Sequence, residues 1–487
     1  KPMQLYNSMT RRKENFEPRQ AGRVGMYACG ITAYDLSHIG HARSAVVFDV
    51  LNRYLRYLGY DVTFVRNFTD VDDKIIARAN REGKTSAEIA ETYIAAFHED
   101  MDRLNVRRAD IEPRATEYIG EMQNLIQKLI DGGHAYAVPS GDVYFRVRSF
   151  PGYGKLSGRD VDELRSGARI AIGEEKEDPL DFALWKAAKP GEPFWESPWG
   201  KGRPGWHLEC SAMSEKTLDL PLDIHGGGQD LIFPHHENEI AQSEASTGKE
   251  LARFWVHNGF VQINSEKMSK SLNNFKTIRD ILEHRQPETL RFFLLGKHYR
   301  SPIDFSFEGL DDAERALKRV YECLRDARAW MQRESWKKGE TPASVQDEFD
   351  MLKKGFFDAM DDDLNTAGAL GHVFGMIRLM NRILEDKGLR NKEGIRDLLG
   401  SFIELAGVWS DVLGVFGAEP TAFLEELRNT RAERLGIDVN KVVELMAERA
   451  EARAARDFAR SDATRDALAA MGVEVRDTPS GAVWDIA

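Results

Sequence analysis

Two histidines that flank a glycine are the first residues whose type and spacing suggest chemistry. His38-Ile-Gly-His41 follows a short apolar stretch and precedes a run with helical periodicity. Backbone N–H groups and the helix dipole favour phosphate at such a position, and both imidazoles can bond triphosphate oxygens. A pair of turn histidines without a ligand is the alternative. The position after a predicted strand favours nucleotide binding.

A second group, Lys267-Met-Ser-Lys-Ser271, offers two ammonium groups in a predicted loop. A cationic loop can compensate the charge that develops on a phosphate during displacement. A lysine pair alone is more typical of a solvated surface loop. Together with the histidine pair, however, this group resembles a recognised paired signature, and the resemblance implies that Lys267 and Lys270 act in catalysis with His38 and His41.

Two cysteines, a histidine and a glutamate form the third group. His235 and Glu239 are four residues apart after Pro234, so both side chains can project from one helix face. With the thiols of Cys29 and Cys210 they make a plausible zinc ligand set. The long separations leave open a simpler reading, in which Cys29 is a buried strand cysteine and His235 a helix-capping residue.

A strand, a helix and a second strand must position the histidines. The pattern predicts a strand over residues 24–29, a helix over 42–58 and a strand over 61–68. Such a unit indicates a parallel sheet whose active-site loops lie at the carboxyl ends of the strands. We therefore expect Cys29 and the histidine pair at that edge, with the helix beginning near Ala42.

The α/β pattern is interrupted and then resumes. Residues 131–204 are rich in Gly, Pro and aromatic residues, and 142–148 alternate as a short strand does, so we predict a small β insertion. A strand then follows at 222–225 and is expected to turn through the glycines 226–228. A helix near Pro234 and a strand over 254–263 complete the second half of the sheet.

The remaining sequence is helical until close to its end. Beyond Ser306 the pattern indicates a helical bundle to about Gly414, and a separate module begins near Val439 and ends in a strand over 471–477. The predicted class is α/β, with a Rossmann-like parallel-sheet catalytic domain carrying an insertion, an α-helical bundle and a small C-terminal α+β module. The expected domains are 1–130 and 205–260 (catalytic halves), 131–204 (insertion), 261–305 (signature loop), 306–435 (bundle) and 436–487 (C-terminal module).

Composition indicates the class of protein and the cellular compartment. The chain has 487 residues, a formal net charge of −12 and three cysteines, too few for a disulfide framework. The acidic balance argues against a surface wholly devoted to nucleic acid, although a local basic groove is compatible with it. Neither a long apolar run nor a secretion signal occurs, so we expect a cytoplasmic protein without a membrane span.

Taken together, the histidine and lysine groups resemble the paired signatures of class I aminoacyl-tRNA synthetases. The surrounding blocks are similar to those of the cysteine-specific family, over a resemblance that runs from Leu5 to Trp484; these blocks are residues 26–35, 67–74, 205–213 and 225–239. Ile31, Ala33 and Asn273 depart from the family pattern. None of them removes a functional side chain, but Asn273 puts the motion of the lysine loop in question.

The resemblance implies a reaction, its cofactors and its partners. We expect ATP-dependent activation of L-cysteine to cysteinyl-adenylate, then transfer to the 3′-terminal adenosine of tRNA(Cys), with AMP and pyrophosphate released. It also implies one zinc ion per chain on Cys29, Cys210, His235 and Glu239, Mg²⁺ with ATP, and a monomer. Shape alone separates near-isosteres by only ~10–200-fold, whereas zinc can bind the sulfur of cysteine and so reject serine.

The resemblance further assigns binding residues by position. ATP is expected at His38, His41, Gly226, Asp230 and Lys270; the amino acid at Thr69, Trp206 and His225; and the anticodon at Arg453, Phe458, Asp462 and Asp477. Each has a structural alternative: core packing for Trp206, a satisfied strand-end histidine for His225, a helix cap for Thr69 and a solvated amphipathic helix around Arg453. A run of three glycines is by itself a weak nucleotide signal.

Two other functions remain open from the sequence. A ligase that joins activated cysteine to an amino-sugar inositol in mycothiol synthesis shares the catalytic half and the zinc set, but it is shorter and lacks the last module. A catalytically inactive paralogue that binds RNA or zinc should have lost signature histidines or lysines. All of these are present here.

Overall fold

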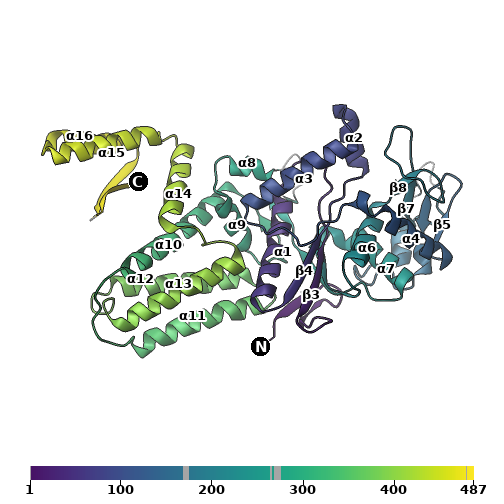
Figure 1. Cartoon of the computed structure of the whole chain (residues 1–487), viewed down its shortest axis with the longest axis horizontal. Coiled ribbons are helices and arrows are strands. Elements are labelled where there is room, and N and C mark those ends of the chain that lie inside the picture. The colour runs from purple at the N-terminus through teal and green to yellow at the C-terminus, as the bar shows by residue number, and fades with distance from the viewer. Residues whose placement is uncertain (1, 168–169, 171–174, 264–265, 268–275, 479) are drawn as a thin grey trace.

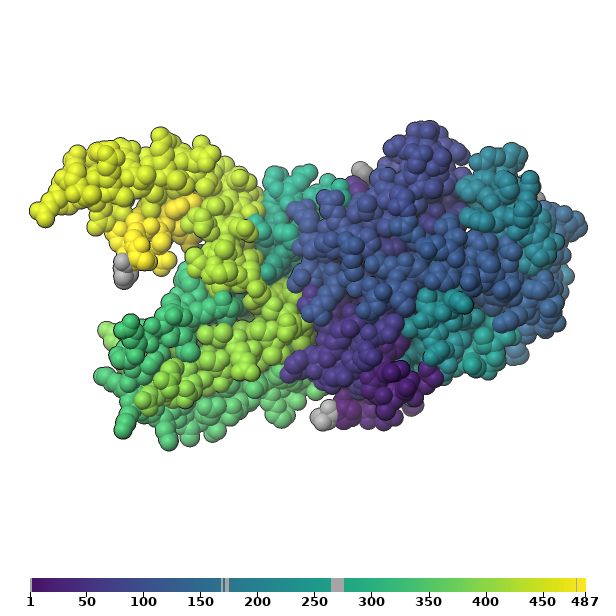
Figure 2. All heavy atoms as spheres, in the orientation of Figure 1, coloured from purple at the N-terminus to yellow at the C-terminus, as the bar shows by residue number. Residues whose placement is uncertain are grey.

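The chain was analysed as a computed structural model, which describes residues 2–487 except 168–169, 171–174, 264–265, 268–275 and 479. The molecule is elongated, with the inserted domain at one end, the parallel sheet beside it, the helical bundle next and the C-terminal module at the far end (Figure 1). In the space-filling view an open notch separates the C-terminal module from the bundle (Figure 2). No helix in the described ranges is long and apolar enough to cross a membrane.

A four-stranded parallel sheet forms the centre of the catalytic half. Its strands are β3 (Arg23–Ala28), β4 (Asp61–Arg66), β9 (Leu222–Gly228) and β10 (Ala252–Asn258), in the order β10-β9-β3-β4. Helix α1 (Ile39–Tyr57) connects β3 to β4, which confirms the predicted strand–helix–strand unit and the α/β class. Most of α1 is buried, as expected for a helix covered on both sides.

Helix α1 begins three residues earlier than the sequence pattern indicated. The side chain of His38 accepts hydrogen bonds from the backbone N–H groups of Gly40 and His41 and so caps the helix. Histidine is not among the preferred capping residues, so the apolar periodicity alone placed the start near Ala42. The consequence is that His41 lies in the first helical turn and not before it.

The glycines at 226–228 continue a strand, so the predicted turn is wrong. They belong to β9 and pair with the end of β10. A Cβ atom at Gly226 would lie 2.1 Å from the carbonyl oxygen of Val256 and 2.6 Å from Cζ of Phe48. Close approach of a neighbouring strand and of α1 therefore requires glycine here.

The expected strand over 254–263 is also two separate strands. β10 ends at Asn258, and β11 (Val261–Ile263) lies in another sheet with β12 (Glu266–Lys267) and β13 (Ile303–Asp304), in the order β12-β11-β13. This small sheet leads into the lysine signature. It is built partly from the segment that precedes the bundle.

The inserted segment folds as an antiparallel sheet of β5 (Ala135–Ala137), β6 (Val143–Phe145), β7 (Phe182–Ala187) and β8 (Gly202–Pro204). The predicted strand over 142–148 is shorter, because a 3-10 turn over Val147–Ser149 follows β6 and the Val147 N–H donates to the buried Asp181. The other helices of this half are α2 (Asp73–Glu82), α3 (Ser86–Arg103), α4 (Ile119–Asp131), α5 (Val161–Gly167), α6 (Trp206–Thr217) and α7 (Glu237–Thr247). An N-terminal hairpin pairs β1 (Gln4–Asn7) with β2 (Arg12–Asn15).

The helical part continues the core of the catalytic sheet. Its helices are α8 (Ile278–Leu282), α9 (Pro287–Leu295), α10 (Phe307–Met331), α11 (Ala343–Asp361), α12 (Thr366–Glu385), α13 (Glu393–Leu413) and α14 (Pro420–Arg434). One cluster of buried apolar side chains runs from β3 and α1 into α10, α12 and α13. The catalytic sheet and the bundle therefore share one hydrophobic core.

The C-terminal module has a small core of its own. It consists of α15 (Val439–Ala454), α16 (Phe458–Ala470) and a hairpin of β14 (Val473–Thr478) with β15 (Gly481–Ile486). Side chains of two preceding helices contact the hairpin. Lys318 of α10 pairs with Asp485 at 2.8 Å. The Arg428 guanidinium of α14 lies 3.7 Å from the centre of the Trp484 ring and donates to the Trp484 carbonyl oxygen at 3.2 Å.

Candidate active site

A cavity of about 690 Å³ opens at the carboxyl ends of β3, β9 and β10. It lies where ligands bind in open parallel sheets. Members of all three predicted groups line it: Cys29 of the metal set, His38, His41 and Asp230 of the nucleotide set, and Trp206 of the substrate set, together with Gly228, Asn258 and Gly259. A single space therefore adjoins both the histidine pair and Cys29 of the cysteine cluster, which comprises Cys29, Cys210, His235 and Glu239.

The two signature histidines are fixed at the N-terminus of α1. Their rings stack with centres 3.7 Å apart and planes inclined by 19°. The Nδ1 atom of His38 accepts from the N–H groups of Gly40 and His41, and the Nδ1 atom of His41 accepts from the N–H of His38 at 3.2 Å. Both imidazoles are thus held at the positive end of a long helix, where a phosphate is favoured.

Among the other predicted nucleotide residues that the structure describes, only Asp230 lines this cavity. Asp230 lines it from a 3-10 turn over Gln229–Leu231, whereas Gly226 lies within β9 and serves the close packing described above. Lys267 lies in β12, opposite Gln262 of β11. Lys270 falls outside the described residues.

The four predicted metal ligands converge on one point. Cys29 follows β3, Cys210 lies in α6, His235 in a π-helical turn over Ile232–His236, and Glu239 in α7. Their ligand atoms all lie within 4.8 Å of one another. The two sulfur atoms are 3.7 Å apart, and the Glu239 Oε2 atom lies 3.5 Å from Nε2 of His235.

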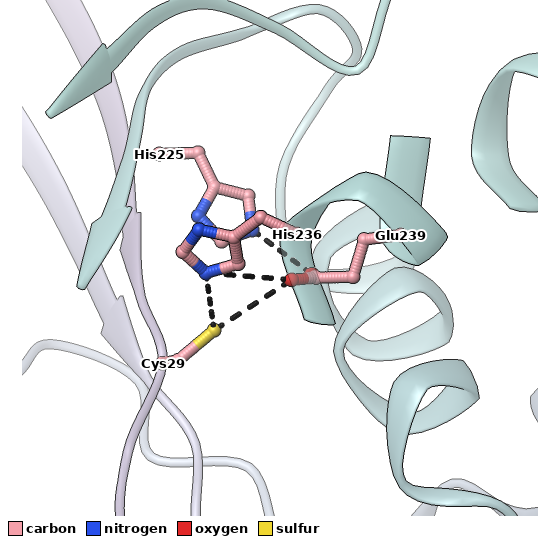
Figure 3. A group of neighbouring side chains, drawn as sticks. All are labelled: Cys29, His225, His236 and Glu239. Carbon is pink, nitrogen blue, oxygen red and sulfur yellow. Dashed lines mark hydrogen bonds and ion pairs between the residues drawn. The ribbon is translucent and has the colours of Figure 1, made fainter. Parts of the chain in front are cut away.

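Two further histidines reach the same point (Figure 3). Nε2 of His236 lies 3.2 Å from Sγ of Cys29, and Nε2 of His225 lies 2.9 Å from Oε1 of Glu239. His225, His236, Cys29 and Glu239 make a second set whose ligand atoms lie within 4.8 Å. Sequence reasoning missed His236, although its spacing of three residues from Glu239 places it on the same helix face.

Outer contacts hold these histidines in place. Nδ1 of His236 lies 2.8 Å from Nε2 of His257, whose Nδ1 lies 2.8 Å from the Ser8 hydroxyl. Nδ1 of His235 lies 2.9 Å from Nδ1 of His207, and the Trp206 ring stacks on His235 at 4.0 Å. Partners of this kind orient the rings of metal-binding histidines and tune their basicity.

The electrostatics of the cluster match a cation site. Burial raises the pKa of the Cys29 thiol well above its usual value, lowers the pKa of His235 and of His236 well below theirs, and raises the pKa of Glu239. Without a cation, burial thus opposes every charge at this point. A bound cation would favour the ionised thiols and carboxylate, while the histidines are already kept as the neutral imidazoles that bind metals. Nε2 of His235 is buried without a hydrogen-bond partner among the described residues. Two thiols, an imidazole and a carboxylate fit zinc.

The predicted substrate residues differ in their exposure to the cavity. Trp206 lines it and is 38% exposed. Thr69 and His225 are not among the lining residues; both are buried, the Thr69 hydroxyl donating to Glu209 at 3.1 Å and His225 contacting Glu239. Thr69 and His225 therefore contact buried carboxylates beside the cysteine cluster, namely Glu209 and Glu239.

The predicted anticodon residues lie together in the C-terminal module. Arg453, at the end of α15, pairs with Asp477 of β14 at 2.8 Å. Arg449, which the sequence reasoning did not single out, makes two further contacts with Asp477 at 3.1 and 3.2 Å. Phe458 and Asp462 are exposed on α16, Phe458 by 65%. Hydrogen bonds from Arg449 and Arg453 lower the pKa of Asp477 to about 2.

Three family models match consecutive parts of the chain. Residues 15–315 match the catalytic domain of class I (C) tRNA synthetases, 355–417 match the DALR domain, and 440–484 match the anticodon-binding domain of cysteinyl-tRNA ligases. The first match covers the parallel sheet, its insertion and both signatures. The last covers α15, α16 and the C-terminal hairpin.

Relatives of known name match over the full length. A cysteine–tRNA ligase of Nitratidesulfovibrio vulgaris strain Miyazaki F is 70% identical over 484 residues, which is 99% of this chain and 100% of that protein. One of Oleidesulfovibrio alaskensis is 65% identical over all of both chains. Among solved structures, a Mycobacterium tuberculosis methionyl-tRNA synthetase in complex with methionyl-adenylate shares the fold, with a TM-score of 0.63 over 81% of this chain and 92% of that one at 15% identity.

Proposed function

Because this chain belongs to the cysteine–tRNA ligase family of class I aminoacyl-tRNA synthetases, we propose a role for each of its site residues in the reaction of that family. The chain activates L-cysteine with ATP and charges tRNA, releasing AMP and pyrophosphate. The observation that carries the assignment of residues is one cavity that adjoins both the capped histidine pair and the cysteine cluster.

Cys29, Cys210, His235 and Glu239 would hold one zinc ion. The set is supported by the convergence of their ligand atoms and by the unpartnered Nε2 of His235. Zinc bound there would supply a preference for the sulfur of cysteine over the hydroxyl of serine. His225 and His236 then act as supports, His225 by orienting the Glu239 carboxylate and His236 by contacting Cys29.

ATP would occupy the part of the cavity beside α1, with its triphosphate at His38 and His41. Their fixed rings and the helix N-terminus favour the negative charge that develops as the cysteine carboxylate attacks the α-phosphate. Asp230, Lys267 and Lys270 complete the proposed nucleotide site, and Gly226 supports it through the backbone. Mg²⁺ enters with ATP, and no covalent intermediate with the enzyme is required.

Trp206 closes the proposed amino-acid site. Its ring stacks on His235 and faces the cavity, so it can exclude larger side chains while Thr69 and His225 support the buried wall. The 3′ end of the tRNA would then enter between this wall and the inserted domain. The cysteinyl-adenylate is attacked there by a hydroxyl of the terminal ribose.

The anticodon of tRNA(Cys) would bind the C-terminal module. Exposed Phe458 offers a ring on which an unpaired base can stack, and Arg453, Asp462 and Asp477 offer polar groups beside it. We assign residues 436–487 to this role, 131–204 to the inserted domain and 306–435 to the bundle between them. We further propose a cytoplasmic monomer, since one chain carries every group named here.

The two rival functions are not favoured. The full-length match to cysteine–tRNA ligases includes residues 440–484, which match the anticodon-binding domain that a small-molecule cysteine ligase lacks. An inactive paralogue would have lost signature groups, and His38, His41, Lys267 and Lys270 are all present.

Pyrophosphate exchange and charging assays test the proposal. Wild-type protein should exchange pyrophosphate into ATP with cysteine and not with serine, should charge tRNA(Cys), and should contain one zinc per chain. Exchange without charging would point to the small-molecule ligase instead. Absence of exchange in zinc-loaded protein would leave a binding paralogue.

A further inference from the structure

A buried aspartate of the bundle is bonded to a segment of the catalytic half. Asp363 lies in the turn between α11 and α12 and is fully buried. Its Oδ1 atom accepts from the backbone N–H of Tyr6 at 2.8 Å and from the Tyr299 hydroxyl, and its Oδ2 atom accepts from Nε of Arg300 at 2.7 Å. One carboxylate thus joins the N-terminal hairpin, the bundle and the segment that precedes β13.

The backbone of this turn is unusual. Asp363 and Leu364 have φ angles of 54° and 51°, in the left-handed region that residues other than glycine seldom adopt. Such a conformation persists where the surroundings fix it. Here the Asp363 N–H donates to the carbonyl oxygen of Gln4 at 2.9 Å, and Nε2 of His298 lies 3.0 Å from the Asp363 carbonyl oxygen.

Residues 298–300 contact Asp363 through their side chains and the cavity side through their carbonyl oxygens. Their side chains all contact Asp363: His298 lies 3.4 Å from Oδ2, and Tyr299 and Arg300 make the bonds above. Their carbonyl oxygens point to the nucleotide side and accept from three different elements. The donors are Nη2 of Arg43 at 2.9 Å, the N–H of Gly259 at 2.7 Å and Nε2 of Gln229 at 3.1 Å.

Each of those donors is part of the cavity wall or adjoins it. Gly259 lines the cavity, and Gln229 precedes the lining residue Asp230. Arg43 lies two residues after His41 and also donates to the carbonyl of Phe260, another lining residue. The spacing is tight, because a Cβ atom on Gly259 would lie 2.7 Å from the carbonyl oxygen of Ser301. A shift of residues 298–300 would therefore move the wall.

The same segment supports the start of the lysine signature. Directly after it, β13 pairs in parallel with β11, with Ile303 opposite Val261. Strand β11 in turn pairs with β12, which contains Lys267. The position of residues 298–304 thus affects both the cavity wall at Gly259 and the small sheet that contains Lys267.

We propose that Asp363 is a positioning residue for ATP, which acts through His298, Tyr299 and Arg300 on the wall of the nucleotide cavity. It is contributed by the bundle, so the part of the chain that carries the anticodon module also sets the geometry where ATP binds. This inference rests on the proposed placement of ATP beside His38 and His41. It concerns the nucleotide and not cysteine, because the cysteine cluster contacts none of these three residues in the described structure.

Replacement of the carboxylate by an amide tests the proposal in the full-length protein. Asp363→Asn keeps the size of the side chain, but its NH₂ group cannot accept hydrogen bonds, so at least one of the donors Tyr6, Tyr299 and Arg300 loses its acceptor. Cysteine-dependent pyrophosphate exchange is measured with ATP varied at saturating cysteine and then the reverse. We expect KM for ATP to rise about tenfold, which corresponds to ~1.4 kcal/mol, while KM for cysteine stays within about twofold of wild type.

Two more variants keep the test decisive. Asp362→Asn alters the neighbouring carboxylate, which pairs with Lys13 at 2.7 Å and not with residues 298–300, and it should leave both KM values unchanged. Tyr299→Phe removes a single donor to Asp363 and should raise KM for ATP by a smaller factor; it decides the question if Asp363→Asn does not fold.

The outcomes separate this inference from the proposed function. Equal rises in both KM values, or loss of active protein with unchanged KM values, would mean that Asp363 is structural only. Unchanged kinetics in Asp363→Asn would overturn the inference while wild-type exchange still supports the synthetase assignment. Failure of wild type to exchange at all would instead count against the proposed nucleotide site.

Discussion

The cysteine cluster and the proposed anticodon group (Arg453, Phe458, Asp462 and Asp477) are built in opposite ways. Around Cys29 the groups come from four separate elements and almost all are buried. Most of their polar atoms are hydrogen-bonded, with Nε2 of His235 and Nδ1 of His225 as exceptions among the described residues. Around Asp477 two arginines of one helix meet one strand, and Phe458 stands in solvent. A buried polar group that loses its partner is costly, whereas exposed pairs contribute little. The two regions should therefore respond to substitution on very different scales.

Loss of a thiol from the buried cluster should have the largest effect. We expect Cys210→Ser to lose zinc and to lower cysteine-dependent pyrophosphate exchange by more than ~100-fold. Replacing even the outer partners of metal ligands typically lowers metal affinity or activity by ~10–100-fold, and loss of a ligand itself should cost more. Cys323→Ser is the matched control, since Cys323 is a buried thiol of α10 apart from the cluster. Zinc analysis and exchange rates check both. Zinc retained in Cys210→Ser would contradict the ligand assignment.

A supporting histidine should matter less than a ligand. His225→Asn removes the imidazole that lies 2.9 Å from Oε1 of Glu239, so we expect zinc affinity to fall by ~10–100-fold while the protein still binds the metal. Competition with a chelator measures the affinity. His134→Asn in the inserted domain, where the ring lies 2.8 Å from the Ser149 hydroxyl, should change nothing. Equal affinities for wild type and His225→Asn would rule out a supporting role.

An exposed ring of the C-terminal module should give a smaller and more selective effect. Phe458→Ala is expected to raise KM for tRNA about tenfold, because stacking of a base on an aromatic ring is worth ~1–3 kcal/mol. Pyrophosphate exchange without tRNA should be unchanged. Val443→Ala, at a residue of α15 that is 56% exposed, serves as the control and should charge tRNA normally. A normal KM in Phe458→Ala would remove Phe458 from the anticodon site.

The ion pairs of Asp477 should contribute least to stability. Their stabilisation is present above the unfolded pKa of ~3.9 and is lost as pH falls towards about 2, the value to which Arg449 and Arg453 lower the pKa of Asp477. Asp477→Asn should therefore lower the thermal midpoint by ~2 °C or less at pH 7, and by a smaller amount near pH 3. Calorimetry at both pH values checks this. An equal difference at the two pH values would mean that the pKa of Asp477 is not depressed.

Local pattern was enough for much of the catalytic half. The apolar run before His38 and the helical periodicity after it placed both histidines at the end of a strand, because these signals depend on neighbours in sequence. The zinc set was different: Cys29 and Cys210 are far apart in the chain, so residue types alone left a buried strand cysteine as the alternative, and the family resemblance decided between the two. The structure brings them together through a fold that no short window contains.

What the sequence missed depends on long-range packing. The glycines at 226–228 resemble a turn, and only the proximity of Phe48 and Val256 explains why they continue a strand. His236 was passed over because its partner Cys29 is remote in sequence, and Arg449 because a buried arginine in an Ala- and Arg-rich helix looks solvated. Asp363 was passed over for the same reason, since its partners come from two distant segments, the N-terminal hairpin and residues 298–300.

Helix α14 makes the length of the chain itself a part of recognition. It runs over Pro420–Arg434 between the bundle and the C-terminal module, and Arg428 in its middle lies on Trp484. One residue inserted into a helix advances everything beyond it by 1.5 Å and rotates it by about 100°. An insertion in α14 would therefore turn the C-terminal module relative to the bundle and the cavity. A change in the number of residues of α14 should for this reason disturb the proposed tRNA binding more than a change in the length of a surface loop.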